Sequence, residues 1–440
     1  MNLSDVASVT LRKVTLRLIP FLFVLYIVAW LDRVNVGFAG LQMNADLGFS
    51  SAAFGFGSGV FFLGYCLFEV PSNLVLHRVG ARRWIARIMV TWGIISVGMM
   101  FVRTTLTFYV LRFLLGAAEA GFFPGVVYYL SHWYPEGQRA RAIAAFMTAV
   151  PVSGAIGGPL SGALLSLNGL FGLAGWQWLF LVEGLPAILL GVIVLVYLTD
   201  RPETADWLSS AEKDWLVSTL AAERTSRHGA VPIGIFAALT NRTIWQLGII
   251  FFLAAIGFYG YSFWAPLVVK SLTRSSDVNV GIILGAISAV TIIFMALNSA
   301  HSDRIDERPW HVAVPLLVMA VGFFGCALLS EPNLAVLSLA LIPIGHCAAY
   351  GPFWSMPTRF LAGAPAAAGV ALVVTIANVG GFLGPTLIGA LEDRAGAHGS
   401  AFMLLGTCAI IAALLALRLR QVAVLRSAPA GKLVGEHLKN

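Results

Sequence analysis

Long apolar segments follow one another along almost the whole of this 440-residue sequence. A helix needs about 20 mostly apolar residues to cross the hydrocarbon core of a bilayer. Only 11% of the residues are charged, whereas roughly 25% is typical of soluble domains. The sequence therefore predicts an all-α membrane protein with twelve transmembrane helices. We place them near residues 16–40, 52–76, 84–102, 106–132, 142–167, 176–198, 245–269, 280–300, 311–330, 334–356, 368–391 and 401–418.

Positive charge is spread unevenly over the connections between these segments. Of the 28 Lys and Arg residues, 22 fall on the side that holds both termini, four fall on the other side and two lie within helices. Because cytoplasmic loops collect Lys and Arg, we expect both termini in the cytoplasm. The net charge of +7 then comes mostly from basic residues on the cytoplasmic side. They include no basic-aromatic array of the kind that binds nucleic acid, so the expected surroundings are membrane lipid.

Two landmarks repeat along the chain at one offset. Arg78, in HRVGARR, and Arg304, in SDRIDER, are 226 residues apart, and the same offset separates Gly158-Pro159 from Gly384-Pro385. The shared offset indicates two six-helix halves. Duplicated halves of this kind hold a substrate site between them, near the membrane midplane.

The longest polar stretch divides the two halves. We expect an N-terminal six-helix bundle over 1–198, a cytoplasmic linker with short helices over 199–242, and a C-terminal bundle with a cytoplasmic tail over 243–440. Within the linker, Ser209 and Glu212 have the spacing of a capping box that opens a helix.

Four ionisable residues lie inside the first and fourth apolar segments: Asp32, Arg33, Arg112 and Glu119. Arg112 and Glu119 are seven residues apart and so share one helix face, and the rise per residue puts Asp32 and Arg112 at similar depth. We therefore expect Asp32 to hold Arg112. Helix–helix adhesion is the alternative role for such charges.

The balance of these charges changes with a single proton. With Glu119 protonated, the four groups sum to +1, and a surplus cation in a low-dielectric site attracts an anion. Anion binding and protonation of Glu119 then favour one another, which is a coupling of two binding events. Arg33 is the cation available for the anion.

The second half offers polar and aromatic side chains inside its helices, namely Tyr259, His346, Trp354 and Asn378. We expect the first half to bind the charges of the proton and the substrate, and the second half to recognise the shape of the substrate. For any single aromatic residue, core packing is the alternative role. The four cysteines lie far apart without a metal-ligand spacing. We expect no metal, no cofactor other than the coupling proton, and no enzyme activity.

Several motifs together resemble one transporter family. The segments WLDRVNVGFA, GYCLFEVPSNL, RFLLGAAEAGFFPGVVYYLSHWYP and WQWLFLVEGLPAIL are similar to those of the anion:cation symporters of the major facilitator superfamily. That family includes bacterial permeases for tartrate, phthalate, hydroxyphenylacetate and hexuronates, and it is related to sialic acid and vesicular glutamate transporters. The resemblance implies a bacterial inner-membrane protein that works as a monomer.

The resemblance also implies roles for particular residues. It assigns carboxylate binding to Arg33, with Tyr65 and Asn378 lining the substrate site. It assigns proton coupling to the first-helix Asp and the fourth-helix Arg and Glu. The superfamily has a motif that closes the cytoplasmic side of the transporter. The residues that match this cytoplasmic gate motif are Arg78, Arg82, Asp303 and Arg304.

Two departures from the family pattern matter. His77 replaces the first-half gate aspartate, which weakens the expected first-half gate. Val150 stands near the place of a glutamine found in sugar-acid members, which favours a less hydroxylated acid, aromatic and dicarboxylic acids included.

The sequence thus predicts a transporter that imports a small organic carboxylate by proton symport. An exchanger or exporter of the same fold is the first alternative, supported by a partial antiporter-like glycine motif around Gly158. A membrane-bound sensor is the second alternative, and no output domain in the sequence supports it.

Overall fold

The computed structural model describes residues 3–227, 240–360, 364–395 and 399–427. In these ranges twelve helical segments are long and apolar enough to cross a membrane, and each overlaps one of the segments expected from the sequence. The predicted all-α, twelve-span fold is therefore confirmed. In chain order the elements are α1 (Leu3–Leu47), α2 (Ser51–Val79), α3 (Ala81–Gly98), η1 (Met99–Phe101), α4 (Thr105–Glu119), α5 (Phe122–Ser131), α6 (Glu136–Met147), α7 (Ala149–Leu165), η2 (Leu170–Gly172), α8 (Gly175–Tyr197), η3 (Pro202–Thr204), α9 (Ser210–Arg227), α11 (Arg242–Thr273), α12 (Asp277–Ile305), α13 (Pro309–Leu328), α14 (Pro332–Phe360), α15 (Ala364–Ala395) and α16 (Gly399–Ser427).

Short polar signals fix where several helices begin. Ser50 caps α2 by accepting a hydrogen bond from the Ala53 backbone at 3.1 Å. Thr104 opens α4 through a capping box with Thr107. These contacts satisfy backbone N–H groups that have no partner within the helix.

The predicted capping box of the linker is confirmed. The Ser209 backbone donates to the Glu212 carboxylate at 2.8 Å, and the Glu212 backbone donates to the Ser209 hydroxyl at 3.4 Å. Together they open α9. Residues 228–239 of the predicted linker and 428–440 of the predicted tail lie outside the described residues.

Large apolar side chains cover much of the outer surface of the helices. Val196 is 86% exposed and Leu106 71% exposed. Contiguous apolar surface of this kind is unfavourable in water and favourable against lipid tails. The surface therefore agrees with the membrane-spanning assignment.

The helices form two compact units. Unit 1 comprises residues 1–232, 259–289 and 381–398, and unit 2 comprises 233–258, 290–380 and 399–440. The unit boundaries fall inside α11, α12 and α15. The spatial units therefore differ from the two sequence halves, because two segments of the second half belong to unit 1.

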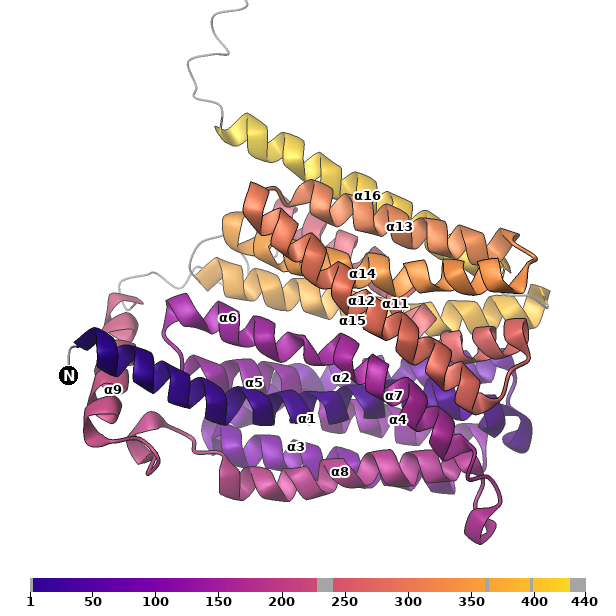
Figure 1. The fold of residues 1–440 in the computed structure, drawn as a ribbon, viewed down its shortest axis with the longest axis horizontal. Helices are drawn as coiled ribbons and strands as arrows, with labels where there is room; N and C mark the ends of the chain where they lie inside the picture. Colours follow the sequence, from indigo (N-terminus) through magenta and orange to yellow (C-terminus); the bar gives the residue numbers. More distant parts are fainter. Residues whose placement is uncertain (1–2, 228–239, 361–363, 396–398, 428–440) are drawn as a thin grey trace, which may run out of the picture. The chain divides into compact units, whose positions relative to one another are not determined.

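Each unit has its own helix packing. In unit 1, α8 lies along α3 and also contacts α1 and α7 (Figure 1). In unit 2, α13 packs between α14 and α16. Close packing of this kind places the buried charges of α1 and α4 inside unit 1, which positions the site described next.

Candidate functional site

A buried ion pair joins α1 to α4. A terminal nitrogen of the Arg33 guanidinium donates to Oε1 of Glu119. Arg33 is 8% exposed and Glu119 2% exposed. Charges this deeply buried persist only when they are paired, so each of these two residues depends on the other.

Aromatic rings surround the same guanidinium. Its central carbon lies 5.3 Å from the ring centre of Trp30, 5.5 Å from Phe61 and 5.4 Å from Tyr65, distances at which the ring faces attract a cation. Tyr259 of α11 accepts a hydrogen bond from Arg33. Three residues that the sequence assigned to substrate binding, Arg33, Tyr65 and Tyr259, therefore meet within unit 1.

The guanidinium keeps an uncommitted donor. Nε of Arg33 is buried and has no hydrogen-bond partner in the described part of the chain. A guanidinium can bind a carboxylate through two parallel N–H groups. Arg33 can therefore donate a further hydrogen bond, from Nε, to a bound anion.

Asp32 does not hold Arg112, and that expectation was wrong. Its carboxylate accepts from Nε1 of Trp92 at 2.8 Å and from the Ser96 hydroxyl at 2.7 Å, both on α3. Consecutive residues point about 100° apart around a helix. Asp32 therefore faces α3, while Arg33 faces α2 and α4.

Arg112 has backbone partners instead. It donates to the carbonyl oxygen of Gly57 at 3.4 Å and of Ser58 at 3.2 Å, on α2. Its side chain is completely buried, and the nitrogen NH1 has no partner among the described residues. Arg112 interacts with Asp32 and Glu119 through the electric field only.

The fourth span is broken directly after Glu119. Helix α4 ends at Glu119, Gly121 adopts φ +90°, and α5 begins at Phe122. The Ser72 hydroxyl donates to the freed carbonyl oxygen of Ala120 at 2.6 Å. The sequence predicts one continuous helix over 106–132. Gly121, directly after the Glu119-Ala120 pair, was the signal for the break.

Glu69 also belongs to the surroundings of Arg33. It lies one helical turn after Tyr65 on α2 and interacts electrostatically with both Tyr65 and Arg33. It was not among the residues expected at the site. Its i,i+4 spacing from Tyr65 was the signal that could have placed it on the same helix face.

Unit 2 holds the remaining residues assigned to substrate binding. Nε1 of Trp354, Nδ2 of Asn378 and Nδ1 of His346 are all buried without a hydrogen-bond partner among the described residues. His346 stacks on Phe258, with ring centres 4.1 Å apart. Buried polar atoms are normally paired, so these three are available for hydrogen bonds to a ligand.

The first-half gate residues diverge in their contacts. Arg82 is tied to Asp200, with its backbone N–H at 2.9 Å and its Nε at 3.7 Å from the carboxylate. His77 packs edge-on against the ring of Tyr128 at 4.4 Å. No ion pair involves Arg78 in the described part of the chain.

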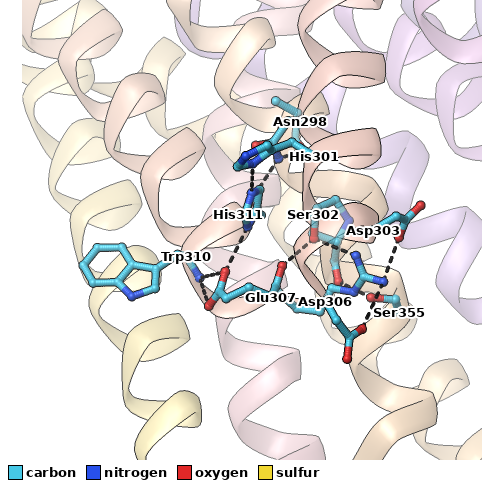
Figure 2. A network of polar contacts seen from close by, with 12 residues as sticks. Asn298, His301, Ser302, Asp303, Asp306, Glu307, Trp310, His311 and Ser355 are labelled. Carbon is cyan, nitrogen blue, oxygen red and sulfur yellow. Dashed lines mark hydrogen bonds and ion pairs between the residues drawn. The ribbon is translucent and has the colours of Figure 1, made fainter.

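Of the two second-half gate residues, Asp303 belongs to the polar network shown in Figure 2. Arg308 pairs with Asp303 at 2.7 Å and donates to Ser302 at 2.7 Å, with Asp306 at 3.9 Å. These contacts fold the α12–α13 turn onto the end of α12. Arg304 forms no ion pair with any described residue.

The same network continues into α13. Glu307 lies 2.9 Å from Nδ1 of His311, whose Nε2 lies 2.7 Å from Nδ1 of His301 (Figure 2). Asn298 donates to the backbone oxygen of His311 at 2.9 Å. The turn is therefore fixed from both helices that flank it.

Comparison with known proteins agrees with this arrangement. The family model described as Major Facilitator Superfamily matches residues 22–385. A protein of Agrobacterium vitis that is provisionally named a tartrate transporter is 48% identical over 96% of this chain and 96% of its own length. The inner membrane transport protein RhmT of Escherichia coli is 38% identical, over 93% of this chain and 95% of its own.

Solved structures show the same fold at low identity. The inward-open xylose transporter XylE of Escherichia coli superposes with a TM-score of 0.72 at 14% identity, covering 92% of this chain and 95% of that one. With the family match over most of the sequence, twelve spans and transporter relatives along nearly the full length, this chain is a multi-pass membrane transporter that belongs to the Major Facilitator Superfamily.

Proposed function

We propose that this protein imports a small organic carboxylate together with protons. The observation that carries the proposal is the buried Arg33–Glu119 pair. A substrate carboxylate and the Glu119 carboxylate are chemically alike, so they compete for the same guanidinium. Protonation of Glu119 removes its charge and releases Arg33 for the substrate.

This competition couples the two ions. A proton on Glu119 raises the affinity of Arg33 for the anion, and by linkage the bound anion raises the affinity of Glu119 for the proton. The empty carrier returns with Glu119 ionised and paired to Arg33, so the site carries no unpaired buried charge at that stage. The proton is thus the coupling ion.

A small organic acid is the substrate class that fits these residues. Arg33 supplies the cation, and its planar guanidinium matches the geometry of a carboxylate. The relative provisionally named a tartrate transporter supports a dicarboxylic acid. Localisation in a bacterial inner membrane with both termini in the cytoplasm follows from the charge distribution over the loops.

The test uses purified protein in proteoliposomes, with tartrate and a panel of aromatic and dicarboxylic acids. Glu119→Gln mimics the protonated state permanently. Accumulation driven by a pH gradient should fail, because the variant cannot return deprotonated. Counterflow, in which labelled substrate exchanges for unlabelled substrate, should persist because it needs only the loaded carrier.

The matched control is Glu203→Gln, a charge-neutralising change at an exposed position of η3. It should leave both assays unchanged. Proton-driven accumulation at the wild-type level in Glu119→Gln would remove Glu119 from the coupling mechanism. Loss of counterflow as well would mean that Glu119 is needed for binding rather than for coupling.

Export is the second candidate, and one relative favours it. A protein of Acinetobacter baumannii named a quinolone resistance transporter is 39% identical over 89% of this chain and 90% of its own. Everted membrane vesicles distinguish the two directions. An importer loses preloaded carboxylate when the inside of the everted vesicle is acidified, whereas a proton-driven exporter accumulates it.

A further inference from the structure

A second buried carboxyl group lies in unit 1 without a cation. Glu183, on α8, is 3% exposed. Its Oε1 accepts a hydrogen bond from the Ser161 hydroxyl of α7 at 2.7 Å, and its Oε2 is buried with no partner among the described residues. All four residues that lie one helical turn from Glu183, namely Leu179, Phe180, Pro186 and Ala187, are apolar, so nothing in α8 itself balances its charge.

Asp32 is the charged group that faces Glu183. The two carboxyl groups are close enough to interact electrostatically. Asp32 is 1% exposed, and its oxygens accept only from the neutral donors Trp92 and Ser96. Arg33 is committed to Glu119, and Arg112 donates to backbone oxygens of α2.

An unpartnered amide completes the group. Asn35 lies three residues after Asp32, on the same face of α1, and is 1% exposed. Its amide interacts with the Glu183 carboxyl group, although neither Nδ2 nor Oδ1 has good hydrogen-bond geometry with any described residue. We call Asp32, Asn35, Ser161 and Glu183 the α1–α8 cluster.

Helices α1, α3 and α7, which all pack against α8 in unit 1, contribute neutral or acidic groups here. Helix α1 supplies Asp32 and Asn35, α7 supplies Ser161, and α3 supplies Ser96 through its bond to Asp32. Two ionised carboxylates in such surroundings would repel each other, which is unfavourable in a low-dielectric interior. Arg112 interacts electrostatically with Asp32 and offsets part of this cost.

One proton would remove both the repulsion between the two carboxylates and the lack of a hydrogen-bond partner at Oε2 of Glu183. On Oε2 of Glu183 it would cancel one negative charge, and it would turn the bare oxygen into a donor that Oδ1 of Asn35 can accept. We propose that Asp32 and Glu183 hold one proton between them, carried on Glu183, as a proton-binding site separate from the Arg33–Glu119 pair.

The proposal can be tested without substrate, because binding of this proton does not require that the protein transports anything. Infrared spectroscopy of the purified wild-type protein at neutral pH should show the C=O stretch of a buried protonated carboxylic acid that shifts in deuterated water. The band should persist in Glu119→Gln and disappear in Glu183→Gln. An unchanged band in Glu183→Gln would overturn the proposal.

Ser161→Ala keeps the experiment informative if Glu183→Gln fails to fold. It removes the hydrogen bond to Oε1 and should shift the frequency of the same band. A band that stays at its wild-type frequency in Ser161→Ala would place the proton elsewhere and contradict the proposal.

A metal cation is the competing occupant of the cluster. Melting temperatures in sodium chloride and in choline chloride distinguish the two. A proton site predicts equal melting in both salts for the wild type and for Glu183→Gln. Stabilisation of the wild type specifically by sodium, lost in Glu183→Gln, would show a sodium site and overturn the proton assignment.

Discussion

At the scale of single residues, the guanidinium of Arg33 has three kinds of partner at once. It is paired with a carboxylate, surrounded by aromatic rings and left with one free N–H. A lysine would keep the charge but lose the planar fork and the stacking. The planar geometry of the guanidinium therefore matters more than its charge for the contacts that Arg33 makes.

Arg33→Lys should therefore bind substrate poorly. Hydrogen bonds to charged groups contribute about 1.5–3 kcal/mol, which corresponds to a loss of affinity of roughly 10- to 100-fold. Isothermal titration of the purified variant measures it. Arg103→Lys, at an exposed position after η1, is the control and should bind normally. Equal affinities for the two variants would contradict the role of Arg33.

Sequence spacing identified the buried charges of the first and fourth spans but not their partners. It set Asp32 and Arg112 at similar depth, whereas the structure pairs Arg33 with Glu119. It failed for Asp32, because the choice between α3 and α4 as its neighbour depends on helix packing. Side-chain partners such as Trp92 cannot be recognised from periodicity inside an apolar helix.

At the scale of elements, the break between α4 and α5 places Glu119 at a helix end. Gly121 adopts a left-handed conformation there, and a Cβ atom would meet the side chain of Ser72. An apolar run hides such a break, because a single glycine is tolerated in membrane helices. The number of helices was thus predictable, whereas their interruptions were not.

Gly121→Ala should destabilise the protein. A non-glycine residue in the left-handed region costs roughly 1–2 kcal/mol, and the contact with Ser72 adds to this cost. Thermal melting in detergent measures the loss. Gly137→Ala is the control, because its added Cβ would meet nothing within 4 Å and should leave melting unchanged or raise it. A variant at Gly121 as stable as wild type would argue against the strained break.

The start of α9 gives an element-scale prediction for pH. Burial opposes the charge of Glu212, but the ion pair with Lys13 at 2.6 Å and the hydrogen bonds from Ser209 hold the pKa of this carboxyl below its ordinary value. A carboxylate of this kind stabilises the fold above its unfolded pKa, and the contribution is lost as pH falls through the folded pKa.

Glu212→Gln keeps a side chain that suits the capping box and loses the ion pair. The wild type should melt above the variant at pH 7, and the two curves should converge as the pH falls below about 4. Melting temperature as a function of pH checks this, with Glu203→Gln as the control, whose difference from wild type should not vary in the same window. A constant gap between wild type and Glu212→Gln would exclude the ion pair as its source.

At the scale of the whole molecule, unit 1 joins distant parts of the sequence at one end of its helices. Asp393 of α15 accepts from the backbone N–H groups of Ser51 and Ala52, each at 3.0 Å, and so caps α2. Gln42 of α1 donates to Asp277 of α12 at 2.8 Å. The charge distribution over the loops predicts that this end faces the outside of the membrane.

Asp393→Ala should favour opening at this end. Loss of a helix cap costs about 1 kcal/mol, which shifts a two-state population about fivefold. A single cysteine at Phe56, whose ring lies 5.8 Å from that of Phe382, should be labelled faster from outside in the variant.

Asp46→Ala is the matched control for that experiment. It removes a hydrogen bond from Trp176 at the same end without touching α15, and the labelling rate should stay at the wild-type value. Equal acceleration by both changes would show general loosening rather than release of α15.

At two glycines of α2, the backbone of α15 lies directly against the helix. A Cβ added to Gly55 would lie 2.5 Å from the backbone oxygen of Pro385, and one added to Gly59 would lie 2.5 Å from that of Phe382. At these two points the helices can separate and come together again without any change of side-chain rotamer. An alanine at either glycine would hold the two backbones apart, so it should slow the return to the closed contact.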